Sequence, residues 1–366
     1  MSQADVDAAQ LNRSEAFTGT KPVADAHRFD LEALDRWLRA HVEGYAGPLR
    51  VSQFKGGQSN PTFLLETPQA SYVMRAKPGP ALKLLPSAHA IEREFRVMSA
   101  LAGSEVPVAR MHALCEDESV IGRAFYVMEH VAGRVLWEPT LPGMSPAERS
   151  AHFDELNRVI AALHQVDWRA RGLADYGRHD GHIARQIRRW TAQYRASETE
   201  SIIAMDALIQ WLPAHIPPEE ETALIHGDYR LDNVIFHPTE PRILAVLDWE
   251  LSTLGHPLAD FAYHCMSWVL PPGAGRGLAG VDLAGSGIPS LEAYIERYCE
   301  RTGRSAIANF DFYLAYNLFR MAGILQGIMK RVLEGTATSE HALAMGRAAR
   351  PMAELGWQIA QRIDHG

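Results

Sequence analysis

The sequence predicts an α+β protein built from two lobes, a small β-rich lobe followed by a larger, mainly helical lobe. Short segments with strand-like alternation, separated by turn sequences, gather early in the chain, and segments with helical periodicity dominate the rest. A chain of 366 residues is also long for one domain and sufficient for two lobes. We expect a loosely ordered tail at residues 1–27, an N-lobe at 28–131 and a C-lobe at 132–366.

The N-lobe elements follow from hydrophobic periodicity and from the turn-forming residues between them. A helix is expected at 29–42, where Asp30 supplies the N-cap and leucines recur on one face. Ser87 and Gly103 mark the two ends of a second helix. Four strand-like segments complete the lobe, at residues 49–54, 62–67, 71–76 and 125–131.

The C-lobe opens with a strong helix signal. Ser145 and Glu148 form a capping box, and Pro146 takes the first helical position. Further helices are expected at residues 182–194, at 201–215 and over most of 258–365, which the Gly/Pro-rich loop 271–288 interrupts. Three short apolar runs of strand length lie between these helices, at residues 223–225, 234–236 and 243–248.

Composition and charge narrow the class of protein. Hydrophobic residues make up 47% of the chain and charged residues 22%, so a large core can form. The net charge of −8 argues against a general surface for nucleic acid or anionic membranes. We see no signal-peptide pattern and no apolar run of the roughly 18 residues that a membrane helix needs. The three cysteines follow no CxxC or metal-ligand spacing. The sequence predicts a cytoplasmic protein without nucleic-acid or membrane partners.

The stretch HGDYRLDN, followed by LDWE, carries the chemistry. Asp228 and Asn233 stand five positions apart in a tight loop between two apolar runs, and Asp248 ends a third. Each acid alone is best explained as a solvated turn. Together, an Asp-x4-Asn pair and a strand-terminal Asp form the set used in phosphoryl transfer, where one Asp accepts the proton of the attacking hydroxyl. The Asn and the second Asp are then expected to hold Mg²⁺, which prefers oxygen ligands.

These motifs resemble the aminoglycoside phosphotransferase and choline kinase group of small-molecule kinases, in which HGD replaces the HRD of protein kinases. The segments FKGGQSNPTFLL, YVMRAKPG, FYVMEHVAGR and LDWELSTLGHPLADFAY are similar to a subgroup associated with acyl-CoA dehydrogenases. The resemblance implies a bilobal protein-kinase-like fold, with Asp228 catalytic and Asn233 and Asp248 as Mg²⁺ ligands. It also implies that Asp260 is a structural acid that steadies the catalytic loop.

The nucleotide side of the expected site lies in the N-lobe. Gly56, Gly57 and Ser59 join the first two strands, where backbone N–H groups could approach phosphates, although Gly-Gly at a hairpin is often only a turn. On the next strand, Arg75 matches the phosphate-binding lysine of many relatives, and Lys77 on the same face stays an alternative. Glu94 falls on the apolar stripe of its helix, an unusual place for a carboxylate, and we expect it to pair with Arg75.

The strand at 125–131 matches the hinge between the lobes. The resemblance implies that adenine hydrogen-bonds the backbone around Glu129 to Val131, with Met128 packing near the ring or serving only in the core. The GRGLAG sequence in the loop 271–288 satisfies GxGxxG literally, but no strand leads into it, so we interpret it as a flexible loop. Only eleven residues separate Asp248 from Asp260, too few for a protein-kinase activation segment.

The sequence therefore predicts a phosphotransferase that uses ATP and Mg²⁺ to phosphorylate a hydroxyl group of a small metabolite. The subgroup implies a hydroxyacyl or acyl-CoA-related acceptor. Two alternatives stay open: an aminoglycoside or other antibiotic kinase, and a catalytically silent nucleotide-binding module that has kept the fold. GTP in place of ATP also stays open. A functional link to an acyl-CoA dehydrogenase and a homodimer are the partner hypotheses.

Overall fold

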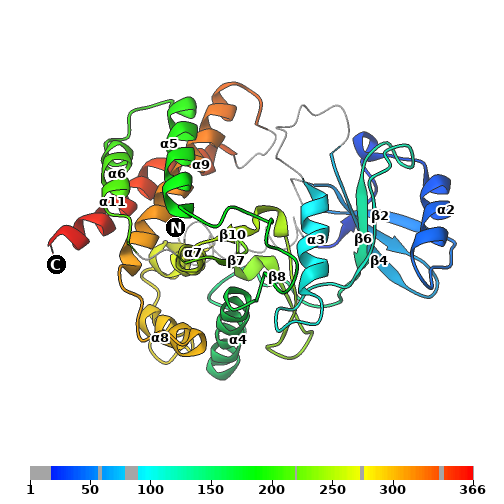
Figure 1. Cartoon of the computed structure of the whole chain (residues 1–366), viewed down its shortest axis with the longest axis horizontal. Helices are drawn as coiled ribbons and strands as arrows, with labels where there is room; N and C mark the ends of the chain where they lie inside the picture. The colour runs from blue at the N-terminus through cyan, green and yellow to red at the C-terminus, as the bar shows by residue number, and fades with distance from the viewer. Residues whose placement is uncertain are drawn as a thin grey trace.

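The computed structural model describes residues 18–56, 60–78, 90–218, 221–272, 276–337 and 342–365. The chain forms a smaller lobe built around an antiparallel sheet and a larger lobe built mainly of helices (Figure 1). The bilobal α+β fold that the sequence predicts is confirmed. Among the described residues, no helix is both long enough and apolar enough to cross a membrane.

The N-lobe is a six-stranded sheet with one helix on each face. The strand order is β1-β2-β3-β4-β6-β5, with all neighbours antiparallel. Its elements are β1 (Thr20–Lys21), α2 (Leu31–His41), β2 (Arg50–Phe54), β3 (Thr62–Glu66), β4 (Ser71–Ala76), α3 (Ile91–Leu101), β5 (Met111–Cys115) and β6 (Phe125–Glu129). Side chains alternate along the strands, so Met74 packs with the α2 face, whereas its neighbour Val73 packs with the α3 face.

Three details of this lobe differ from the sequence predictions. Part of the tail expected at 1–27 is ordered, because β1 pairs with β2 and a short 3-10 turn follows it. Strand β5 was not predicted, since its sequence MHALC lacks clean alternation and its pairing with β6 contains a bulge. Helix α3 begins at Ile91 rather than just after Ser87, which lies outside the described residues. Ala90 is non-helical, and Ile91 is the first buried residue of the stripe.

The C-lobe is organised around the long helix α9, against which α5, α7, α10 and α11 pack. The capping box predicted at Ser145 and Glu148 is confirmed at the start of α4. The helices are α4 (Pro146–His164), α5 (His182–Ser197), α6 (Ile203–Ala214), α7 (Pro257–Val269), α8 (Leu291–Thr302), α9 (Phe310–Leu333), α10 (Ala342–Arg347) and α11 (Ala349–His365). Two small antiparallel sheets face the N-lobe: β7 (Ala223–Ile225) with β10 (Thr253–Gly255), and β8 (Val234–Phe236) with β9 (Ile243–Val246).

Helix α3 is tied to the C-lobe by a buried tyrosine. The Tyr176 hydroxyl lies 2.7 Å from Ser252 Oγ and donates to the Arg93 carbonyl at 3.2 Å. In return, Arg93 donates to the Tyr176 carbonyl at 2.8 Å and stacks over its ring at 4.2 Å. The segment that carries Tyr176 is itself tightly packed, because a Cβ on Gly177 would lie 2.8 Å from the backbone nitrogen of Leu254. These contacts fix the position of α3 relative to the segment around Ser252.

We expect Tyr176→Phe to loosen α3 while the C-lobe stays folded. The change removes one hydroxyl that bridges α3 and Ser252, at a cost of about 1–2 kcal/mol in the free energy of unfolding. Hydrogen exchange of the α3 backbone amides is expected to accelerate. The matched control is Tyr298→Phe, which removes a hydroxyl bonded to His164 within the C-lobe. Equal exchange of the α3 amides in both variants would contradict the bridging role.

Candidate active site

The loop between β7 and β8 brings the predicted Asp-x4-Asn pair together. The Asn233 side-chain amide donates to Asp228 twice, at 2.8 Å to its carbonyl oxygen and at 2.9 Å to Oδ2. Asn233 lies in a short 3-10 turn, Leu231–Asn233, immediately before β8. Both ends of the loop are therefore fixed by the buried strands that flank it, as the apolar runs of the sequence predict.

Asp248 is placed beside this pair by the backbone. The Leu247 N–H donates to the Asn233 carbonyl at 2.8 Å, so Asp248 follows one residue after that contact. Asp248 itself has φ 63° and ψ 59°, a left-handed conformation that costs a non-glycine residue free energy. The buried Trp249 stabilises the turn, since its indole N–H donates to the Val246 carbonyl at 2.9 Å. Strain of this kind is typical of functional sites.

The donors around Asp248 suit a magnesium ion. Asp248 supplies a carboxylate, Asn233 an amide oxygen on the side turned away from Asp228, and Glu250 a second carboxylate two residues on. Mg²⁺ prefers such oxygen ligands, and proteins usually hold it with one or two carboxylates plus substrate phosphates. The described ranges contain no group of three or more His, Cys, Asp or Glu side chains that could hold a metal.

Asp260, on α7, holds the β7–β8 loop, which we call the catalytic loop after its predicted role. Its two oxygens accept the backbone N–H groups of His226 and Gly227, each at 2.8 Å, and His164 Nε2 lies 3.2 Å from Oδ2. Burial by itself raises the pKa of Asp260, but the hydrogen bonds and the nearby histidines hold this pKa below its ordinary value. His226 contacts the Leu247 carbonyl through Nε2 at 2.8 Å, so its ring joins the two loops.

Arg75 reaches the site from β4. The predicted pair with Glu94 is present, with Arg75 Nε 3.0 Å from Glu94 Oε2. The same guanidinium donates through Nη2 to Asp248 at 2.7 Å and to Glu250 at 3.4 Å. Lys77 instead pairs with Glu92. The geometry therefore places Arg75, rather than Lys77, beside the expected metal ligands.

Glu94 is almost fully buried, and both of its oxygens are hydrogen-bonded. Asn60 Nδ2 donates to Oε1 and the Tyr126 hydroxyl donates to Oε2, each at 3.1 Å. Burial raises the pKa of Glu94 to about 7, against the lowering effect of Arg75. Burial also lowers the pKa of Arg75, but Glu94 and the other acids around it raise this pKa above its ordinary value, so the guanidinium stays charged. The cluster links Asn60, β4 and β6 to α3.

The other residues that the sequence predicts to bind the nucleotide lie in or near the strands of the N-lobe. Gly56 follows β2, whereas Gly57 and Ser59 lie outside the described residues. Met128 is buried in the core on the α3 face of the sheet. The Glu129 backbone N–H is used by the Arg110 carbonyl at 2.8 Å, so it cannot also serve a bound base. Val131 is partly buried against the same core.

Three further side chains surround Asp228 that the sequence analysis did not assign. The Tyr263 hydroxyl donates to Asp228 Oδ1, and Arg230 Nε lies 3.1 Å from the same oxygen. Arg320 donates to the Gly227 carbonyl at 2.9 Å and lies over the Tyr263 ring. For Tyr263 a sequence signal exists, because it stands three positions after Asp260 and so shares its helix face.

A cavity opens beside Asp228 between α4, the catalytic loop and α7. Its wall is mostly apolar, with Arg230, Asp232 and Arg276 as its charged members; the other lining residues are Trp137, Pro139, Phe153, Leu156, Leu231, Tyr263, His264, Met266, Ser267, Leu270 and Met321. Arg276 Nη2 donates to Asp232 at 3.0 Å, which ties the loop 271–288 to the catalytic loop. The described part of that loop is packed, since Leu278 is buried and bonded to Ser267, and this differs from the flexible loop we expect from the sequence.

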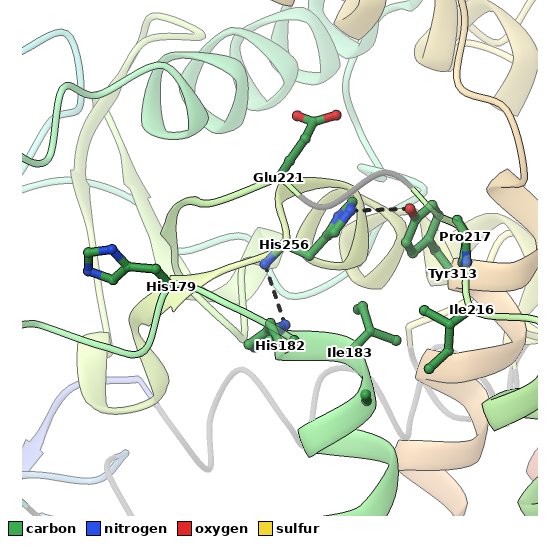
Figure 2. A pocket seen from close by; sticks show the side chains of 10 residues that line it. His179, His182, Ile183, Ile216, Pro217, Glu221, His256 and Tyr313 are labelled. Atoms are coloured by element: carbon green, nitrogen blue, oxygen red, sulfur yellow. Dashed lines mark hydrogen bonds between the residues drawn. The ribbon is translucent and has the colours of Figure 1, made fainter.

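A second cavity lies elsewhere in the C-lobe, and its polar groups already have partners. Figure 2 shows the His256 ring turned toward the Tyr313 hydroxyl, 3.3 Å away, while the His256 backbone N–H reaches His182 Nδ1 at 3.4 Å. The His256 side chain also caps α7 by accepting from Leu258 N–H. These histidines support the start of the helix that carries Asp260, and they do not extend the site around Asp228.

A two-lobed fold with this loop and a strand-terminal Asp defines a kinase-like phosphotransferase. The profile of the phosphotransferase enzyme family matches residues 50–304. The chain belongs to that family.

The curated relatives are larger proteins. Acyl-CoA dehydrogenase family member 10 of Mus musculus is 46% identical over 346 residues, which cover 94% of this chain and 32% of that protein. Acyl-CoA dehydrogenase family member 11 of Homo sapiens is 42% identical over 354 residues, or 94% of this chain and 45% of that protein. The chain thus spans less than half the length of these relatives. The subgroup that the sequence motifs indicate is confirmed.

Solved structures share the fold. A crystal structure from Ralstonia eutropha, provisionally assigned as an aminoglycoside phosphotransferase, is 64% identical with a TM-score of 0.85 and covers 92% of this chain and 99% of its own. The aminoglycoside phosphotransferase APH(4)-Ia is 16% identical with a TM-score of 0.59, covering 91% of this chain and 99% of its own. That second likeness concerns the fold alone.

We expect Asp260→Asn to destabilise the protein by about 2–3 kcal/mol, measured by urea unfolding. The change removes the charge that accepts two buried backbone N–H groups and faces His164, and hydrogen bonds to charged groups contribute about 1.5–3 kcal/mol. The control is Asp175→Asn, whose side chain is 77% exposed in its pair with Arg96. It is expected to cost less than about 1 kcal/mol. Similar losses for the two variants would show that Asp260 does not hold the loop.

Stability is expected to fall below pH 6.5 because of His264. Burial lowers the pKa of its imidazole from 6.5 to about 4, so the unfolded chain binds a proton in this window and the folded chain does not. The neutral ring therefore stabilises the fold fully above pH 6.5, and this contribution is lost as pH falls toward 4. Between pH 7 and pH 5 the wild type should lose about 2 kcal/mol more than His264→Gln in urea unfolding. Parallel losses would contradict the assignment.

Proposed function

We propose that the protein is an ATP- and Mg²⁺-dependent phosphotransferase that phosphorylates a hydroxyl group of a small metabolite. The observation that carries this proposal is the convergence of Asp228, Asn233, Asp248 and Arg75 from three separate segments of the chain: the β7–β8 loop, the end of β9 and strand β4. A silent module that had kept only the fold would have no need for all four to meet. Family membership and the kinase-like fold support the same conclusion.

Each residue has a distinct role in the proposed reaction. Asp228 orients the acceptor hydroxyl and takes its proton as the oxygen attacks the γ-phosphorus. Arg75, held by Glu94, binds the α- and β-phosphates through its guanidinium. Asn233 and Asp248, with Glu250 beside them, hold the magnesium ion, which neutralises phosphate charge when bound. The segment with Gly56, Gly57 and Ser59, between β2 and β3, is proposed to cover the phosphates. The end of β6 with Met128, Glu129 and Val131 is proposed to receive the adenine, without the Glu129 N–H, which already donates to Arg110. We propose the same two lobes as functional units, residues 28–131 for the nucleotide and 132–366 for catalysis and acceptor.

ATP is the proposed donor. Structural neighbours of the same fold have been solved with ADP and hygromycin B, with AMP-PNP and hygromycin B, and with streptomycin and ATP. Another neighbour was solved with GDP, so the choice between ATP and GTP belongs to the experiment below. The protein is proposed to act in the cytoplasm.

The cavity beside Asp228 favours a hydroxyacyl or acyl-CoA-related acceptor over an aminoglycoside. Its wall is mainly apolar, which suits a hydrocarbon chain, and Arg230 and Arg276 supply positive charge that suits an anionic group. A polycationic antibiotic would meet Asp232 as the one acid in the wall, and that acid is already paired with Arg276 and Arg230. The names of the curated relatives agree with a role near acyl-CoA dehydrogenases, which we propose as functional partners.

The test is phosphoryl transfer from ATP or GTP, with Mg²⁺, to a panel of hydroxyacyl-CoAs, hydroxy acids and aminoglycosides. Transfer to a hydroxyacyl compound is expected, and Asp228→Asn should lower kcat by about 10²–10⁴-fold while leaving nucleotide binding intact, because the general base is lost. The matched control is Asp180→Asn, whose side chain is 93% exposed. Binding of Mg·ATP without transfer to any acceptor would favour the silent module, and absence of nucleotide binding would refute the kinase.

A further inference from the structure

The catalytic carboxylate already holds a hydroxyl group that belongs to the protein. The Tyr263 phenol donates to Asp228 Oδ1, in the position relative to Asp228 that the proposed reaction requires of an acceptor hydroxyl. Tyr263 also lines the cavity beside Asp228 and is 6% exposed. The phenol therefore stands between the acceptor space and the general base.

Asp228 has two further partners besides Tyr263. Asn233 donates to Oδ2 at 2.9 Å, and Arg230 Nε lies 3.1 Å from Oδ1. Both carboxylate oxygens thus have partners from the chain itself. A hydroxyl that is to lose its proton at Oδ1 competes there with the Tyr263 phenol, which is the hydroxyl among these three partners.

Tyr263 is held where it stands. The Arg320 guanidinium lies 5.1 Å from the centre of its ring and donates to the carbonyl of Gly227, next to Asp228 in sequence. One turn earlier on α7, Asp260 binds the amides of the same loop. Burial and the charge of Asp228 raise the pKa of the Tyr263 phenol, so it stays protonated and remains a hydrogen-bond donor at neutral pH.

We propose that Tyr263 determines specificity against water, by occupying Asp228 until an acceptor that fills the cavity displaces its hydroxyl. This inference rests on the proposed function. Without the phenol, a water molecule can donate to Asp228: its oxygen bonds to the γ-phosphorus, its proton passes to Asp228, and the bond from phosphorus to the bridging oxygen breaks to give ADP and phosphate. Water makes no further contacts that compensate for displacing Tyr263, whereas a true acceptor gains burial against the apolar wall.

The experiment uses Tyr263→Phe in the full chain and needs no known acceptor. With Mg·ATP alone, the release of ADP is expected to rise by about tenfold, the effect of one hydrogen bond to a charged group, while the affinity for the nucleotide stays unchanged. The control is Tyr45→Phe in the N-lobe, whose buried hydroxyl also donates to a carboxylate, that of Asp35, at 2.6 Å. ADP release by this control should match that of the wild type. Adding Asp228→Asn to Tyr263→Phe should remove the gain.

The outcomes separate this inference from the proposed function. If Tyr263→Phe binds Mg·ATP normally but releases ADP no faster than the wild type, water is not excluded by Tyr263 and the inference is wrong. If neither protein binds Mg·ATP, the proposed function fails and the inference fails with it. Thermal unfolding checks that the variant is folded. If it is not, Tyr263→Leu, which also lacks the hydroxyl, is expected to show the same increase, and its absence would refute the role.

Discussion

The geometry of the site depends on one buried carboxylate, that of Asp260. A charge in the protein interior is costly unless hydrogen bonds satisfy it, and here two backbone amides of the catalytic loop and His164 do so. Since the amides belong to His226 and Gly227, the residue that follows them, Asp228, is fixed in direction as well as in place. The loop is short and contains a glycine, yet its backbone is fixed. This is because two of its N–H groups donate to Asp260 on α7, a helix of the core.

From that anchor, a continuous series of contacts crosses to the other lobe. Asp228 is bonded to Asn233, the Asn233 carbonyl receives the N–H of Leu247, and Asp248 follows at once. Asp248 then meets Arg75, which is held by the buried Glu94. Arg75 thus stands among three acids, and their combined charge exceeds its own. The excess negative charge suits a site completed by a divalent cation, and the cation in turn suits the phosphates of a nucleotide.

The sequence predicts those parts of the site in which an acidic residue stands where the local pattern is apolar. A buried acid without a partner costs free energy, and this applies to Glu94 on its apolar stripe and to the acids at the ends of buried strands. The sequence therefore indicates that these acids have partners. No residue of β5 or β1 conflicts in this way with its local pattern. These strands form because a neighbouring strand offers backbone groups for pairing, and the pattern of a single strand does not carry that information. Tyr263 and Arg230 were missed for a related reason, since a tyrosine in an apolar helix and an arginine in a polar loop are ordinary residues until the fold turns both toward Asp228.

Under the proposed function, helix α7 links acceptor choice to the geometry around Asp228. One face of α7 carries residues i, i+3 and i+4, which are Asp260, Tyr263 and His264. Asp260 anchors the loop, Tyr263 donates to Asp228, and Tyr263 and His264 form part of the cavity wall. An acceptor that presses on this wall acts on the same rigid element that positions Asp228. A side chain introduced at this face to admit a larger acceptor would shift the hydrogen bonds of the loop as well, because the helix cannot move at Tyr263 without moving at Asp260. Variation in acceptor size is therefore easier to accommodate at Trp137, Pro139 and Phe153, which line the cavity but belong neither to α7 nor to the loop that carries Asp228.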